Sequence, residues 1–208
     1  MAKRTRRLNP EQIVDATLAL VDEEGLDNLS MRRLGSSLGV EAMSLYNHFR
    51  NKADILDGLH AHLLAEMPIP GSLQGGWEEQ VRAAAQAFRA VLRAHPRAIP
   101  LMASRAAVTP RSLAYFNGGV DIFLRAGLGA VDSLRAFQSV FGFVVGHAAF
   151  HFARLGEEPE DTEALYRDYP ALAKVAATMP YDNDQEFDFG LDLLVTGLRQ
   201  KLEREERA

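Results

Sequence analysis

Apolar residues recur at helical spacing through the first third of the chain, and residues typical of helix ends bound each run. Asn9 is a preferred N-cap, Pro10 takes the first helical position and Gln12 can complete a capping box. The apolar face that follows carries Ile13, Ala16, Leu20 and Val21. Gly25 is a typical C-terminal residue, so the pattern predicts a first helix that ends there.

Three more helices are predicted before the first strong break. Ser30 caps a short helix, Gly39 turns the chain, and a second short helix runs over about 41–48. Asn51 caps a longer helix whose apolar residues are Ile55, Leu56, Leu59, Leu63 and Leu64. Two prolines in "MPIPG", residues 67–71, end it.

Every substantial segment beyond this break also has helical spacing. Helices are predicted over 77–94, 109–125, 132–154 and 184–205, and over 162–178 with a disturbance at Pro170. No run alternates apolar and polar residues as a strand does, so the fold class is all-α. We expect an N-terminal domain over 1–56 and a C-terminal helical domain over 57–208.

The composition indicates the cellular compartment and excludes several kinds of site. The chain has no cysteine, which excludes disulfides and thiolate metal sites, and no apolar run long enough for a signal peptide or a membrane span. We therefore expect a cytoplasmic protein with no membrane partner. The net charge is −5, yet the arm over 1–8 carries four basic residues and no acid, Lys3, Arg4, Arg6 and Arg7.

Two short helices joined by a glycine turn and braced by a preceding helix describe a helix-turn-helix. The second short helix of that motif enters the major groove of DNA. Its core side should hold Val40, either Met43 or Leu45, and Phe49. The alternative is a small helical subdomain whose polar residues are merely solvated.

Hydroxyl, amide and basic groups gather on the side left for DNA, where they suit phosphates and base edges. The expected DNA-contacting residues are Ser30, Arg32, Ala42, Met43, Ser44, Tyr46, Asn47, His48 and Lys52.

The run "LSMRRLGSSLGVEAMSLYNHFRNKADILDGL", residues 29–59, resembles the DNA-binding segment of the tetracycline-repressor (TetR) family of bacterial regulators. The resemblance rests on the pair Leu45-Tyr46, on His48 and on Lys52. It implies that Tyr46 and His48 position the helix on phosphates, whereas Ala42, Met43 and Asn47 vary with the operator. Two departures from the family pattern are Gly35, where alanine is usual, and Glu41, where a small capping residue often stands.

"GWEEQVRAAAQAFRAVLRAHPRA" and "FDFGLDLLVTGLRQKL" resemble the tetracycline-repressor subgroup and imply a homodimer joined by two helices of each subunit. Residues 132–154 are apolar nearly all round, which favours partners on both sides. The expected interface residues are Gly142, Gly146, Phe187, Gly190, Leu194, Gly197 and Leu198. The alternative is that both helices are the core of a monomer.

An effector pocket is expected among the middle helices. Its candidate lining is Phe88, Leu92, Met102, Phe116, Phe137, Phe141 and His151, each of which could equally be ordinary core. Polar residues that hold the drug and its magnesium in the tetracycline repressor are replaced here, among others by Ala84, Met102 and Gly119. The histidine that ends the fourth helix there has become Met67 or Pro68. We therefore expect a less polar effector and no cofactor.

His147 and His151 are four residues apart, a spacing that can bind a metal from one helical face. "HAAFH" lacks the acid of the zinc-protease motif, and no carboxylate nearby in the sequence completes a site. The prediction is no metal, with one histidine in the core or interface and the other in the pocket.

These patterns predict a ligand-responsive transcriptional regulator, most simply a repressor. Its partners would be double-stranded operator DNA, a small effector and a second copy of the chain. The effector would release a palindromic operator. The alternatives are a helical-bundle enzyme, for which no nucleophile-base pair, phosphate loop or paired carboxylates stand out, and an adaptor that binds only protein.

Overall fold

The computed structural model describes residues 8–153, 166, 168–176, 182–205 and 207, and within these ranges it contains helices and no strand, which confirms the all-α class. The helices are α1 (Pro10–Glu24), α2 (Met31–Leu38), α3 (Ala42–Leu45), α4 (Lys52–Ala65), α5 (Trp77–Ala94), α6 (Ile99–Ser104), α7 (Pro110–Ala126), α8 (Ala130–His151), α10 (Pro170–Ala176) and α11 (Asn183–Glu205). Three short 3-10 turns are η1 (Leu26–Asn28), η2 (Pro70–Ser72) and η3 (Pro96–Ala98). None of the described helices is long and apolar enough to cross a bilayer.

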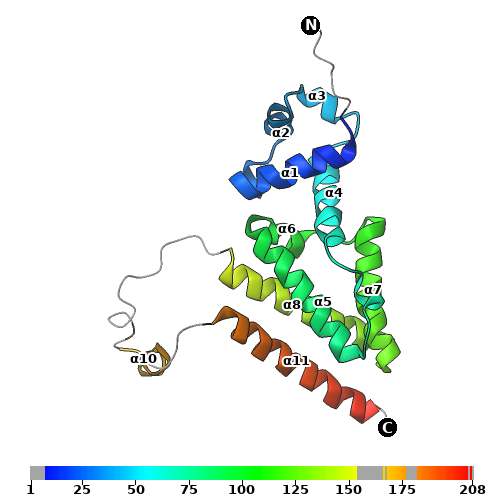
Figure 1. The fold of residues 1–208 in the computed structure, drawn as a ribbon, viewed down its shortest axis with the longest axis vertical. Helices are drawn as coiled ribbons and strands as arrows, with labels where there is room; N and C mark the ends of the chain where they lie inside the picture. The colour runs from blue at the N-terminus through cyan, green and yellow to red at the C-terminus, as the bar shows by residue number, and fades with distance from the viewer. Residues whose placement is uncertain (1–7, 154–165, 167, 177–181, 206, 208) are drawn as a thin grey trace.

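The first three helices form a small head at one end of an elongated molecule (Figure 1). The predicted caps are present: Gln12 N donates to Asn9 Oδ1 at 2.8 Å, and Arg33 N donates to Ser30 Oγ at 3.2 Å. The expected helix over 41–48 is shorter, because α3 ends at Leu45. The carbonyl of Leu45 then accepts from two successive backbone N–H groups, at residues 48 and 49, and the chain turns toward the cap of α4.

Helix α4 connects the head to the larger bundle below it (Figure 1). It is continuous across residues 56 and 57, where the boundary between the domains was expected. Its buried apolar residues are Ile55, Leu59, Leu63 and Leu64. The two regions therefore share one helix, and no flexible linker separates them.

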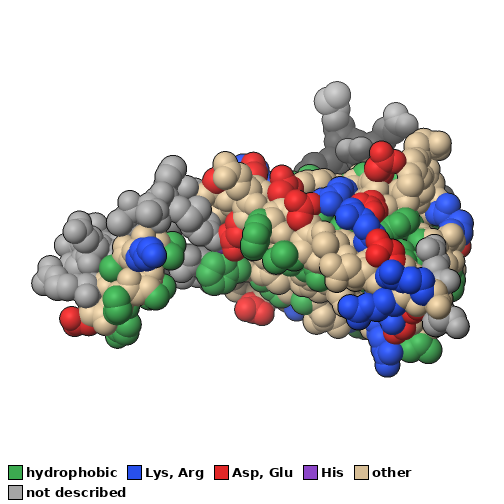
Figure 2. All heavy atoms as spheres, turned by 90° about the horizontal axis from the view of Figure 1, so that it is seen from below, with side chains coloured by type: hydrophobic (Ala, Val, Ile, Leu, Met, Phe, Trp, Pro, Cys, Tyr) green, Lys and Arg blue, Asp and Glu red, His purple; other side chains and the backbone are tan. Residues whose placement is uncertain are grey.

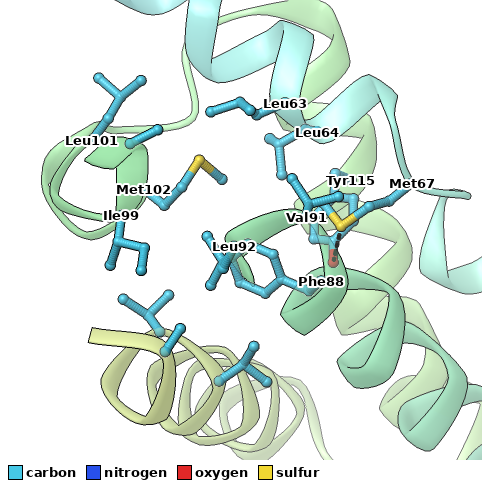
Figure 3. Close-up of a cluster of buried hydrophobic side chains, with 14 of the residues drawn as sticks. Leu63, Leu64, Met67, Phe88, Val91, Leu92, Ile99, Leu101, Met102 and Tyr115 are labelled. Atoms are coloured by element: carbon cyan, nitrogen blue, oxygen red, sulfur yellow. Dashed lines mark hydrogen bonds between the residues drawn. The ribbon is translucent and has the colours of Figure 1, made fainter. Parts of the chain in front are cut away.

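The bundle is built mainly from α5, α7 and α8, with α11 against α8 and the short α6 closing one end. Side chains from α4, α5, α6 and α7 meet in its upper core (Figure 3). Helix α6 was not predicted, because the helix over 77–94 was expected to end before Pro96 and no helix was expected between it and residue 109. Pro100 instead stands in the first turn of α6, where proline needs no hydrogen-bond partner for its nitrogen.

Helix α10 begins at Pro170, for the same reason that α6 tolerates Pro100. The rest of the helix expected over 162–178 lies largely outside the described residues. Figures 1 and 2 show α10 set apart from the bundle, with hydrophobic side chains on its surface. Leu172 and Val175 are each about half exposed there.

Candidate DNA-reading surface and effector cavity

The helix-turn-helix depends on two glycines. Gly39 ends α2 in the left-handed conformation, with φ of +67°. Gly35 faces the start of α3 so closely that a Cβ there would lie 3.0 Å from the carbonyl oxygen of Val40. The glycine found where alanine is usual therefore lets the two helices approach each other.

Helix α3 has one buried anchor beneath an exposed surface. Leu45 is fully buried, whereas Met43 is 73% exposed, which decides between the two candidates for the core. Tyr46, Asn47 and His48 are exposed in the turn that follows. The remaining α3 candidates, Ala42 and Ser44, are half-buried at its surface.

The two adjacent arginines of α2 have different partners. Arg33 donates from Nε to Glu24 Oε1 at 3.0 Å, and this hydrogen bond holds the pKa of Glu24 below its usual range. Arg32 is exposed, and no ion pair of its side chain is found within the described ranges. Arg32 is therefore available for a phosphate or a guanine edge.

The start of α4 offers a second positive position beside α3. Asp54 N donates to Asn51 Oδ1 at 2.9 Å, which confirms the predicted cap. Arg50 is bound to Asp54, with Nε 2.8 Å from Oδ2, whereas Lys52 is half-buried in the first turn. Lys52 and the helix N-terminus can together hold a phosphate.

A small apolar cavity of about 30 Å³, open to solvent on one side, lies between α5, α7 and α8. Its lining is Pro70, Val81, Ala84, Ala85, Phe88, Tyr115, Gly119, Ile122, Phe123, Phe137, Val140, Phe141 and Val144. The Phe88 and Phe141 rings stack with centroids 4.9 Å apart. Gly119 makes room for an aromatic ring, since a Cβ there would lie 2.3 Å from Phe137.

The cavity corrects part of the predicted lining. Phe88, Phe137 and Phe141 line it, and Phe116 packs behind them with its ring centroid 5.1 Å from that of Phe137. Leu92 and Met102 instead belong to the upper core, where α5 and α6 meet α4 (Figure 3). His151 lies near the end of α8 against Glu186, away from this lining.

Tyr115 was not predicted, although it is the polar side chain of the lining. Its hydroxyl lies 4.0 Å from the sulfur of Met67, at the end of α4 (Figure 3). Burial raises the pKa of Tyr115 far above its usual range, so the hydroxyl stays protonated and can donate a hydrogen bond. The residues replacing the tetracycline-binding positions, Ala84 and Gly119, make the rest of this wall apolar.

Basic side chains of the bundle contact α1 of the head and, at two places, the connecting helix α4. His95 Nδ1 lies 2.8 Å from Asp22 Oδ2 at the end of α1. Arg105 donates from Nε to Asp57 Oδ1 at 2.9 Å, and Arg111 donates from Nη2 to the carbonyl of Leu64 at 2.8 Å. These contacts tie α6 and α7 to α4, and the sequence pattern did not reveal them.

Exposed residues, small or apolar apart from Gln138, form two stripes on the surface of the bundle. On α8 the stripe is Leu134, Gln138, Gly142, Gly146 and Phe150, and on α11 it is Phe189, Leu193 and Gly197. Members of each stripe are four residues apart and therefore share one helical face. Phe150, Phe189 and Leu193 are each 58–66% exposed, which is unusual for large apolar side chains so close together.

The predicted interface residues divide between these stripes and the interior. Gly142, Gly146 and Gly197 lie on the stripes, where an added Cβ would meet no neighbouring atom of the described residues within 4 Å. Phe187 is fully buried within its own chain, and Gly190 faces Phe143 of the same chain, so these two residues were wrongly assigned to an interface. Leu194 and Leu198 are half-buried on the same inward side. On α11 the prediction therefore combined Gly197 of the exposed face with residues of the inward face, because both faces are apolar.

The pair His147 and His151 also differs from the prediction. The structure brings Glu186 of α11 to them, with one carboxylate oxygen 3.0 Å from His151 Nε2. The sequence offered no carboxylate close to the pair, and the structure brings Glu186, which lies far along the chain, near both histidines. The acid was missed because it lies on a different helix.

Comparison with known proteins covers both regions. Residues 13–59 match the model of the bacterial regulatory proteins of the tetR family, and residues 69–202 match the tetracyclin repressor-like C-terminal domain. An HTH-type transcriptional regulator of Saccharopolyspora erythraea is 32% identical, with 92% of this chain and 84% of the relative covered. The class D tetracycline repressor protein of Escherichia coli is 31% identical, with 94% and 91% covered.

Solved structures agree over nearly the whole chain. Apo ActR of Streptomyces coelicolor is 26% identical, with a TM-score of 0.83 and with 96% of this chain and 99% of that chain covered. The same protein in complex with (S)-DNPA has a TM-score of 0.79 at 26% identity, with 95% of this chain and 100% of that chain covered. The chain thus belongs to the TetR family of bacterial transcriptional regulators, as a ligand-responsive DNA-binding repressor and not an enzyme.

Proposed function

We propose that the exposed surface around α3 reads a palindromic operator and that an apolar effector in the cavity releases it. The observation that supports this DNA-reading surface is the contrast within α3 between Leu45, which is buried, and Met43, which is exposed. This contrast supports the Met43 side of the helix as the side that faces the groove. Tyr46 and His48 then contact phosphates, whereas Met43 and Asn47 reach base edges.

Two copies of the chain pair through the stripes on α8 and α11. Glycines at positions 142, 146 and 197 allow close helix approach, and the large apolar residues beside them need cover from water. A twofold pair places two α3 helices on successive major grooves, which accounts for a palindromic site.

The effector is a small, largely apolar molecule. Five of the thirteen lining residues are aromatic, and the hydroxyl of Tyr115, the polar side chain among them, is directed to the sulfur of Met67. ActR, which has a similar fold, binds (S)-DNPA in its crystals. For this chain the observation that supports a less polar ligand is the presence of Ala84 and Gly119 in the wall.

Release follows a path through α7 and α4. The cavity is walled by α7, and Arg111 at the start of that helix holds the last carbonyls of α4. A ligand that favours a shifted α7 therefore shifts α4 and the head at its other end. A coupling of about 3 kcal/mol is enough to change operator occupancy by roughly two decades.

A gel shift with the DNA upstream of the chain's own gene tests the reading surface. Tyr46→Ala should weaken binding to all sequences alike, by about 1–2 kcal/mol, whereas Asn47→Ala should change which operator variant is preferred. Light scattering on the same samples should show a dimer. Absence of any shift at low salt, or a monomer that still binds the full palindrome at normal affinity, would contradict the proposal.

A further inference from the structure

Three potential metal ligands meet where the end of α8 crosses the beginning of α11. His147 and His151 lie one turn apart at the end of α8, and Glu186 lies in the first turn of α11. One ligand atom from each residue lies within 4.8 Å of the other two. The two imidazole ring centroids are 4.3 Å apart, and their planes are tilted by 44°.

His147 gives an independent sign that a ligand belongs there. Its side chain is only 8% exposed, and neither ring nitrogen has a hydrogen-bond partner within the part of the chain that the structure describes. A buried imidazole without partners carries a free-energy cost that native proteins seldom leave unmet. A metal ion bound to one nitrogen would remove part of that cost.

The surroundings of His147 are mainly aromatic. The rings of Phe143 and Phe187 lie 6.0 Å and 5.1 Å from the His147 ring and limit the access of water to it.

The positive charge of Arg89, which lies near His147, is paired with the carboxylate of Asp184. Arg89 donates from Nη2 to Asp184 Oδ1 at 2.7 Å, and its guanidinium lies 4.7 Å from the Phe187 ring centroid. The C-terminal end of α8 places the negative end of a helix dipole near the histidines, whereas the first turn of α11, which holds Glu186, places a positive end there. The carboxylate of Glu186 supplies the negative charge that a divalent cation needs at this position.

We propose that His147, His151 and Glu186 bind a divalent transition metal of the zinc class. Two imidazole nitrogens and one carboxylate oxygen are ligands that Zn²⁺ prefers, and they leave a fourth position for water. Mg²⁺ and Ca²⁺ prefer sites made of oxygen ligands. The Glu186 side chain is 42% exposed, so it has room to move toward the ion and bring the ligand atoms to tetrahedral spacing.

Calorimetric titration of the chelator-treated full chain with zinc sulfate tests this site. The wild type should bind one ion per chain, and Glu186→Gln and His151→Gln should each weaken binding by at least about tenfold. His62→Gln changes a histidine on α4, away from the site, and should leave the affinity unchanged. Zinc should also raise the unfolding midpoint of the wild type more than that of Glu186→Gln.

Several results would overturn the site. They are no zinc binding by the wild type, equal binding by Glu186→Gln and His151→Gln, or magnesium binding as tight as zinc binding. Because His147 is buried, its replacement can disturb folding, and the half-exposed Glu186 therefore carries the test. The readout is independent of DNA binding, so failure here leaves the proposed regulator function unaffected.

Discussion

The DNA-reading head and the effector cavity use aromatic side chains in opposite ways. Tyr46 is 45% exposed and follows the buried anchor Leu45 directly in the chain. Phe88 is 2% exposed, and its ring stacks on that of Phe141. An exposed aromatic residue next to polar neighbours contributes little to the hydrophobic core, so its presence in the sequence already indicates a binding role. A buried aromatic residue contributes to the core in any case, so a role in ligand binding can be recognised only once the cavity beside it is known.

The largest effect is expected from removing the anchor of the head. Leu45→Ala deletes a fully buried side chain and should lower the free energy of unfolding by about 2–5 kcal/mol, with loss of operator binding. Met43→Ala, its exposed neighbour, should change stability by less than about 0.5 kcal/mol. Urea unfolding followed by circular dichroism measures both. Similar losses from the two variants would mean that α3 has no distinct buried side.

A second test fills the cavity. Ala84→Trp places a large ring among the lining aromatics and should abolish the fluorescence of a neutral apolar probe, N-phenyl-1-naphthylamine. Ala83→Trp adds the same ring to the exposed side of the same helix and should leave probe binding intact. Operator binding should persist in both variants. Unchanged probe binding in Ala84→Trp would place the ligand elsewhere.

The smallest expected effect is a pH dependence of the free energy of unfolding that arises from His60 on α4, the helix that joins the two regions. Burial lowers the pKa of His60 on α4 below its ordinary value of 6.5, and its Nε2 has no hydrogen-bond partner among the described residues. Below pH 6.5 the unfolded chain therefore takes up the proton more readily, so stability present at higher pH is lost as the pH falls.

His60→Leu should flatten this pH dependence without abolishing it, because burial lowers the pKa of His147 in the same direction. The measurement is the free energy of unfolding in urea at pH 5.5 and 7.5. Its matched control is His62→Leu, a more exposed site on the same helix. An equal loss of slope in the control would assign the effect to surface charge.

Much of the head could be predicted because its signals are local. Each of these signals lies within a few residues of the helix end that it specifies: the caps at Asn9, Ser30 and Asn51 and the turn at Gly39. The pattern even left only two candidates for the buried anchor. Packing of α3 against α2 and the core of the head then selected Leu45, which spacing along one short helix could not do.

The bundle was harder because its functional contacts join distant segments. Met102 and Phe137 are both apolar helical residues, yet only Phe137 faces the cavity, since α6 packs against the upper core. Glu186 reaches His151 from another helix, and Arg111 reaches the end of α4 from α7. Such pairs depend on how helices cross, and a single sequence does not encode that in any local pattern.

The single-turn length of α3 has a consequence for how such regulators diverge. The outward side chains of α3 and of the turn after it, such as Met43 and Asn47, contribute little to the packed interior. The inward Leu45 packs in the core and holds the helix in place. Substitutions at the outward positions can therefore accumulate after gene duplication with almost no loss of foldedness. New operator preferences can arise by neutral drift on this surface, while the same scaffold is inherited unchanged.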